Sequence, residues 1–190
     1  MKFVKQYDIT DFESYKEQLL EHIEYDKEND NCLFCEPADD VQNVTAKSDF
    51  LIDYGKTVPG VMESSRRYSN IVNQMLKTPL RDYAEQSGCD SVEVTSMWWT
   101  EYSREGGFSW HTHQMNNLIA IIQVHLDSPE DATKVWEHEE TLKEGQLIIF
   151  PSSAPHGGFP TKGNKKVIIA VNLNVICGGK TQGYQKFLNS

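Results

Sequence analysis

One apolar run constrains the fold of this chain more than any other feature. Residues 118–124, Leu-Ile-Ala-Ile-Ile-Gln-Val, are rich in β-branched side chains and contain neither Gly nor Pro. This composition is typical of a buried strand. The run is preceded by Trp-His-Thr-His at 110–113, so two histidines lie at the mouth of the predicted strand.

The pattern of apolar residues changes at Gly88. Before it, apolar residues recur at helical spacing, which predicts helices over 11–25 and 62–86, the second broken or restarted at Pro79. The polar, acidic segment 26–49 between them is predicted to be a long loop, with closure over a site as a further hypothesis. After Gly88 we predict only strands, near 92–102, 117–126, 133–138, 146–151 and 166–176.

Two helices followed by a series of short strands predict an α+β fold. We expect the β part to be a jelly roll (a double-stranded β-helix) or a small barrel, with N-terminal helices packed on it, because closure of the β part protects the edges of its strands. The length of 190 residues is sufficient for a single domain with a sizeable core. Within it we expect a helical support and loop region at 1–90, a jelly-roll core at 91–177 and a C-terminal tail at 178–190.

Charge and composition disfavour several classes of function. The formal net charge is −10, with 28 acidic and 18 basic residues, whereas nucleic-acid binding draws its affinity from Lys and Arg contacts. No apolar run approaches the roughly 18 residues of a membrane span. We therefore expect neither nucleic acid nor membrane as a partner, and a cytoplasmic location. Cys32 and Cys35 form a Cys-x-x-Cys pair that lacks the second pair a zinc site needs.

Three histidines form a candidate metal site. Successive side chains of a strand alternate between faces, so His111 and His113 share one face, with their Cα atoms about 6.5 Å apart. This spacing suits two ligands of one metal ion. His156 follows the predicted strand 146–151 in a turn and offers a third imidazole. The other histidines are interpreted as structural: His22, His125 and His138.

Three blocks in the second half of the chain resemble the 2-oxoglutarate- and iron(II)-dependent oxygenases. The blocks are 110–113 with its His-x-His, 145–152 with Gly-x-Leu-x-x-Phe-Pro-Ser, and 166–172, a strand that begins with a basic residue and ends in Asn. They occur in the order that small members of this family show. The resemblance covers about the last 90 residues and leaves the helical first half unassigned.

The resemblance implies a non-haem iron(II) enzyme that uses 2-oxoglutarate and dioxygen to hydroxylate a substrate. It assigns His111 and His156 to the iron, and Lys166, ten positions after His156, to the distal carboxylate of 2-oxoglutarate. Asn116 and Asn172 are polar beside apolar strand positions, so if buried they need hydrogen bonds, and a ligand could supply them. We expect a small molecule or a protein side chain as substrate, and a homodimer is an allowed assembly.

The sequence departs from the resembled pattern at two positions. His113 stands where a carboxylate ligand is expected. The site therefore has three histidines, or two protein ligands plus water, or an acid such as Asp127 or Glu137 completes it. Ile168 replaces the hydroxyl that usually follows the basic anchor by two residues. The identity of the third ligand is left open by the sequence.

Two other functions fit parts of the same pattern. Gly145, Pro151 and His156 also resemble a motif of the cupin dioxygenases, which hold iron with three histidines and use no keto acid. A jelly-roll binding or structural module without turnover is the third hypothesis, because the expected carboxylate is missing. Within the oxygenase hypothesis, Lys165 beside Lys166 is an alternative anchor for 2-oxoglutarate.

Overall fold

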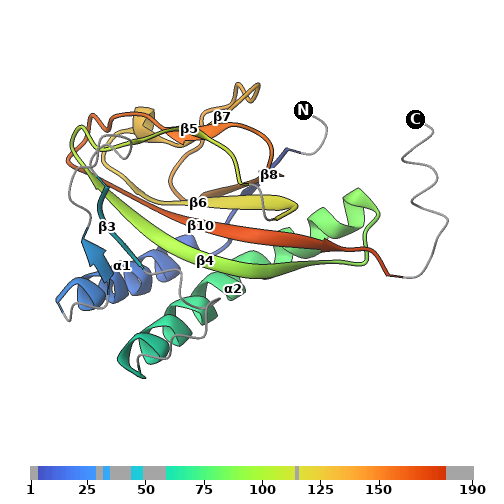
Figure 1. Cartoon of the computed structure of the whole chain (residues 1–190), viewed down its shortest axis with the longest axis horizontal. Helices are drawn as coiled ribbons and strands as arrows, with labels where there is room; N and C mark the ends of the chain where they lie inside the picture. Colours follow the sequence, from blue (N-terminus) through green and yellow to red (C-terminus); the bar gives the residue numbers. More distant parts are fainter. Residues whose placement is uncertain (1–3, 29–31, 35–43, 49–58, 114–115, 179–190) are drawn as a thin grey trace.

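The computed structural model describes residues 4–28, 32–34, 44–48, 59–113 and 116–178 (Figure 1). Its elements, in chain order, are β1 (Lys5–Asp8), α1 (Phe12–Glu28), β2 (Cys32–Phe34), β3 (Val44–Ser48), α2 (Pro59–Ser87), β4 (Ser91–Ser103), β5 (Phe108–His111), β6 (Leu118–Leu126), the 3-10 helix η1 (Pro129–Asp131), β7 (Lys134–Val135), β8 (Gln146–Pro151), β9 (His156–Gly158) and β10 (Lys165–Ile176).

Two antiparallel sheets form the β part of the molecule. The larger sheet has seven strands in the order β1-β8-β6-β10-β4-β3-β2, and the smaller has three in the order β5-β9-β7. Figure 1 shows α1 and α2 on one side of the larger sheet and β5 and β7 on the other. The predicted α+β jelly roll with helices packed on it is therefore confirmed.

The two predicted helices are present, and both are longer than expected. α1 extends three residues beyond the predicted end, and α2 runs without interruption through Pro79. The predicted break at Pro79 is wrong. A proline removes one backbone hydrogen bond, whereas the buried Met75, Leu76 and Tyr83 on either side hold the helix on the apolar core. No helix within the described ranges is long and apolar enough to cross a membrane.

The predicted loop over 26–49 is wrong in part. α1 continues to Glu28, β2 and β3 pair with each other, and β3 adds to the edge of β4. A strand that joins an existing edge gains its backbone hydrogen bonds from a partner distant in the chain, so polar composition does not reveal it. The rest of the segment, including Cys35, lies outside the described residues, as does the hypothesis that it closes over a site.

The long strands agree with the prediction, and the short ones do not. β4, β6, β8 and β10 begin and end within one residue of their predicted bounds, but the strand predicted at 133–138 is reduced to β7. β1, β5 and β9 were not predicted, since three or four residues are too few to show a period. His156 therefore lies in a strand rather than in a turn, and η1 is a helical turn where only strands were expected.

Alternate residues of β10 belong to two different cores. Val167, Ile169 and Val171 belong to the core that also contains the helices, whereas Ile168 belongs to the core that includes residues of both sheets. By the same alternation Lys166 shares the face of Ile168 and points into the jelly roll. β10 pairs with β4 on one side and with β6 on the other, which places this face at the centre of the larger sheet.

Candidate metal centre

The three predicted ligand histidines lie together at the smaller sheet. His111 ends β5 and His156 begins β9, and the two are paired directly in the register of these strands. His113 follows β5 by two residues. The ligand atoms that the three rings offer lie within 4.8 Å of one another. In the described part of the chain this group of possible metal ligands contains no carboxylate, so neither Asp127 nor Glu137 joins it.

Each of the three rings has an oxygen acceptor at Nδ1. The distances are 2.9 Å from His111 to Ser109 O, 3.1 Å from His156 to Ala154 O, and 3.0 Å from His113 to Asn172 Oδ1. Because a carbonyl oxygen only accepts, Nδ1 carries the proton in each ring and the lone pair lies on Nε2. A metal-binding histidine has this arrangement when Nε2 is the ligand atom.

Burial keeps the three rings in the neutral form. It lowers the pKa of His156 to about 3, and the proximity of His111 acts in the same direction. Burial also lowers the pKa of His111 and, with the charge of His111, that of His113. A metal binds the neutral imidazole, so protons do not compete for this cluster at neutral pH.

Lys166 is a buried charge next to the strand that carries His156. Its exposed fraction is 1%, and its Nζ has no hydrogen-bond partner among the described residues. Burial lowers its pKa to about 8, against the opposing effect of the Asp131 charge. Gly158, two residues after His156, leaves room for the amine, since a Cβ there would lie 2.8 Å from Nζ. A buried ammonium without a partner is suited to an anionic ligand.

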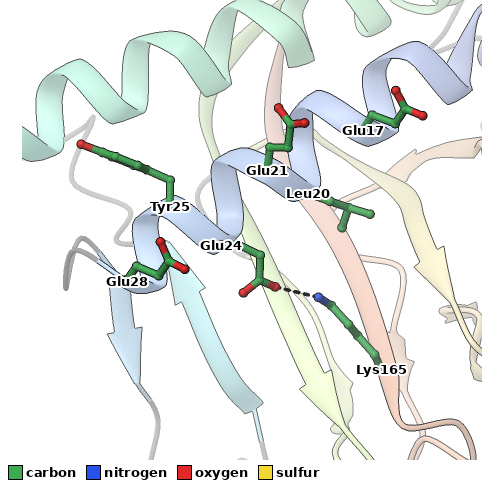
Figure 2. Close-up of a pocket in the computed structure, with 7 residues that line it drawn as sticks. All are labelled: Glu17, Leu20, Glu21, Glu24, Tyr25, Glu28 and Lys165. Atoms are coloured by element: carbon green, nitrogen blue, oxygen red, sulfur yellow. Dashed lines mark hydrogen bonds and ion pairs between the residues drawn. The ribbon is translucent and has the colours of Figure 1, made fainter.

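Lys165 points to the opposite face of β10 and contacts the helix. Its Nζ lies 2.9 Å from Glu24 Oε1 on α1 and 3.1 Å from Glu101 Oε2 on β4. Figure 2 shows the contact with Glu24 in a surface pocket lined by Glu17, Leu20, Glu21, Glu24, Tyr25, Glu28 and Lys165. The pocket contains none of the three clustered histidines. Of the two adjacent lysines, Lys166 is the one that faces the interior of the jelly roll.

Both candidate asparagines are hydrogen-bonded to protein groups. Asn172 accepts from His113 through Oδ1, and its Nδ2 donates to Ser96 Oγ at 2.8 Å. Asn116 Oδ1 accepts from Thr95 Oγ1 at 2.9 Å. The structure thus places Asn172 against a candidate metal ligand, whereas Asn116 is tied to β4.

Three residues that support these groups, Ser96, Asp131 and Gly158, were missed by sequence reasoning. Trp98 stacks on the His113 ring with a centroid distance of 5.9 Å and an interplanar angle of 17°. Asp131, whose exposed fraction is 3%, accepts two backbone N–H groups of the turn before β10. Ser96 is 76 residues away in the chain from Asn172, to which it is hydrogen-bonded. Only the polarity of Ser96 within an aromatic strand could have drawn attention to it.

The other three histidines make contacts elsewhere. His22 Nε2 lies 3.2 Å from Asp26, and His125 Nε2 lies 2.8 Å from Asp127. His138 Nε2 lies 3.2 Å from Gln6. None of them joins the cluster of possible metal ligands. The contact with His125 also occupies Asp127, one of the acids considered as a third ligand.

No protein-family model and no curated protein matches the sequence. Solved structures do match. A prolyl hydroxylase from Trichoplax adhaerens, in complex with a hypoxia inducible factor oxygen degradation domain peptide fragment, has a TM-score of 0.61 at 10% identity over 100% of this chain and 88% of that chain. A 2OG-Fe(II) oxygenase family protein from Burkholderia pseudomallei has a TM-score of 0.56 at 10% identity, covering 88% of this chain and 93% of that chain.

A third structure is a prolyl-4-hydroxylase from Pseudomonas putida, with a TM-score of 0.52 at 13% identity over 93% of each chain. At identities this low, a structural match shows a similar arrangement of the backbone and does not extend to individual side chains. The resemblance seen in the sequence is confirmed at this level. The chain has the fold of the 2-oxoglutarate- and iron(II)-dependent oxygenases.

Proposed function

We propose that this protein is a non-haem iron(II) oxygenase that uses 2-oxoglutarate and dioxygen to hydroxylate a substrate. The observation that carries the proposal is one arrangement: three neutral imidazoles whose ligand atoms lie within 4.8 Å of one another, beside a strand that also contacts the buried Lys166, whose Nζ has no hydrogen-bond partner among the described residues. Imidazole nitrogen suits iron(II), and an unpartnered ammonium suits a carboxylate. The fold is one on which such enzymes are built.

Each residue of this arrangement has a distinct role. His111, His113 and His156 would hold the iron, and Lys166 would bind the distal carboxylate of 2-oxoglutarate. Once bound, iron and 2-oxoglutarate supply the oxidation: one atom of dioxygen enters the substrate as a hydroxyl group, and the other enters succinate as carbon dioxide leaves. The chain contributes binding and orientation. Burial of Lys166 beside Tyr102, 5.2 Å from Nζ to the ring centroid, keeps water from weakening its attraction for a carboxylate.

The co-substrate can be tested without a known substrate. Anaerobic titration of the iron(II)-loaded chain with 2-oxoglutarate should produce a weak visible charge-transfer band. Lys166→Met should bind iron but lose the band at the same concentration of 2-oxoglutarate. Lys165→Met is the matched control and should keep it, because Lys165 contacts Glu24 and Glu101 on the other face of β10.

The outcomes of this titration separate the hypotheses. Bound iron without a band would contradict the use of 2-oxoglutarate and leave the metal site intact. Slow decarboxylation of 2-oxoglutarate, above a metal-free control, would exclude a module without turnover.

Protein side chains are the substrate class to test first. Two of the compared structures are named prolyl hydroxylases, and one of them was solved with a peptide fragment. Proline-containing peptides should therefore be compared with free amino acids and other small molecules for succinate release. A mass gain of one oxygen atom would identify the substrate. Succinate release without such a gain would indicate uncoupled turnover and exclude that compound.

The cluster composition favours one further candidate function. Its three ligands are histidines, and no carboxylate accompanies them among the described residues. Such a set is compatible with a metal dioxygenase that uses no keto acid. Dioxygen uptake with small thiols in the absence of 2-oxoglutarate would favour this function, and activity that Lys166→Met leaves unchanged would support it further.

A further inference from the structure

The three candidate ligands differ in how their rings are held. His111 and His156 are bonded at Nδ1 to backbone oxygens only two residues before them in the chain, at Ser109 and Ala154. His113 instead depends on a side chain that lies 59 residues away, Asn172. The orientation of two ligands is therefore set locally, whereas that of His113 is set by tertiary structure.

Asn172 lies between His113 and the neighbouring strand. Its Oδ1 is 3.0 Å from His113 Nδ1, and its Nδ2 is 2.8 Å from Ser96 Oγ. Ser96 is the residue directly opposite Asn172 in the pairing of β4 with β10, and its exposed fraction is 6%. The contact with Ser96 occupies the amide nitrogen and leaves the amide oxygen directed at the imidazole.

A β-bulge holds the backbone at this position. Asn172 is opposite Ser96 and Leu173 is opposite Val94, so Thr95 is the extra residue of β4. The hydroxyl of Thr95 lies 3.1 Å from Asn172 O. Bulges re-aim side chains and are common beside active sites. Here the extra residue of the bulge, Thr95, contacts the backbone of Asn172.

A second contact restrains the same ring from its face. Trp98, two residues after Ser96 on β4, stacks on His113 at 5.9 Å between centroids and 17° between planes. The amide fixes the edge of the ring and the indole fixes its plane. Both groups belong to the central strands of the larger sheet, which carry little conformational freedom.

We propose that Asn172 is a positioning residue that holds His113 in the Nδ1-protonated tautomer. The lone pair of His113 is then on Nε2, and His113 serves as the third protein ligand where a carboxylate would otherwise stand. The assignment rests on the proposed metal centre and concerns the ligand, not the co-substrate. An amide is a neutral acceptor, so it orients the imidazole without adding negative charge to the centre.

The tautomer can be measured in the metal-free protein. In the chain labelled with 15N-histidine at pH 8, ring 1H–15N correlations should show a proton on Nδ1 of His113 and none on Nε2. Asn172→Leu should move the proton wholly or partly to Nε2, and Asn172→Asp should keep it on Nδ1. Asn174→Leu, a half-buried position on the same strand, is the matched control and should change nothing. A wild-type His113 protonated on Nε2 would overturn the assignment.

Metal affinity tests the consequence of the tautomer. For cobalt(II) in place of iron, Asn172→Leu should weaken binding by about 10- to 100-fold, and Asn172→Asp should restore it. In a His113→Ala background, Asn172→Leu should have no further effect, because its effect passes through that ring.

Two results of the affinity measurements would contradict the assignment. One is an equal loss of affinity for Asn172→Leu in both backgrounds. The other is a weaker affinity for 2-oxoglutarate with unchanged metal affinity, since this would make Asn172 a co-substrate contact. A chain that binds cobalt(II) as expected but never 2-oxoglutarate would refute the proposed oxygenase and still support the role of Asn172.

Discussion

At Lys166 the chain keeps an ammonium group where burial opposes its charge. The exposed fraction is 1%, the Nζ has no hydrogen-bond partner in the described structure, and burial lowers the pKa from an ordinary value of 10.5 to about 8. A group that only stabilised the fold would be paired or replaced by an apolar side chain. An anionic ligand bound to the ammonium would explain why the charge is kept in this unfavourable position.

Lys166→Met should therefore stabilise the ligand-free protein while removing the response to 2-oxoglutarate. Below about pH 8 both the folded and the unfolded state are protonated, and the full cost of burying the charge, on the order of 3 kcal/mol, is present. Between about pH 8 and 10.5 the folded state releases its proton first, so the wild type gains stability and the difference disappears. Urea denaturation of the wild type and the variant at pH 7 and pH 10 measures this difference in the free energy of unfolding. A variant less stable than wild type at pH 7 would contradict the prediction.

The three histidines should not contribute equally to iron binding. His111→Ala and His156→Ala should abolish stoichiometric binding of iron(II), and His113→Ala should weaken it less. His113→Asp should retain the metal, since a carboxylate is the usual third ligand of such centres. Metal content of the four purified variants decides the matter. Full occupancy in His156→Ala would refute the site as a whole.

At the scale of elements, two aspartates after β6 shape the turn that starts β10. Asp127 Oδ2 accepts the backbone N–H groups of Asn164 and Lys165, both at 2.9 Å. Asp131 accepts those of Lys162 and Gly163, at 2.8 and 2.9 Å. These bonds fix where β10 begins. Lys166 is the second residue of β10, so these bonds hold the backbone directly before it.

Removal of the Asp131 carboxylate should loosen this turn. Asp131 is buried, so Asp131→Ala leaves two N–H groups without acceptors and should lower the free energy of unfolding by about 1–3 kcal/mol. Its charge also favours the protonated form of Lys166, so the pKa of Lys166 should fall further. Urea denaturation measures the first effect. Glu130→Ala, at a side chain that is 65% exposed, is the control and should change stability by less than about 1 kcal/mol.

At the scale of the whole molecule, a network of ion pairs joins α1 to the larger sheet. Glu101 of β4, 6% exposed, contacts Lys27 at 3.0 Å and Lys165 at 3.1 Å. Glu24 on α1 contacts the same two lysines at 3.1 and 2.9 Å. This network lies on the helix side of the sheet, so it serves the attachment of α1 rather than the metal centre.

The two glutamates of this network should differ in their contribution to stability. Glu101→Gln leaves two partly buried lysines without their buried partner and should cost about 1–3 kcal/mol. Glu24→Gln should cost less than about 1 kcal/mol, because the Glu24 side chain is 48% exposed and its pairs are screened by water. Thermal or urea denaturation compares them. Equal losses of stability would contradict the predicted difference between the two glutamates. A change in iron binding by either variant would contradict the conclusion that the network attaches α1 and does not serve the metal centre.

Local pattern was sufficient to predict the long strands, both helices and the histidines of the cluster. β-branched composition predicted β6 and β10 to within one residue, because it acts on each residue's own backbone conformation. The alternation of side chains along a strand predicted that His111 and His113 share one face. The jelly roll was predicted from the order of the elements. Short strands and the continuation of α2 through Pro79 depended on partners distant in the chain, which local pattern does not contain.

Tertiary structure alone decided how the candidate site is assembled. Sequence could not choose between Lys165 and Lys166, since adjacent residues of a strand differ only in which face the register assigns to them. Nor could it join Asn172 to His113, because these residues are 59 positions apart and meet only in the folded chain. Residue types and their periods are properties of neighbours along the chain. Which buried polar groups meet is a property of the strand register, and the register is set only when the whole sheet has formed.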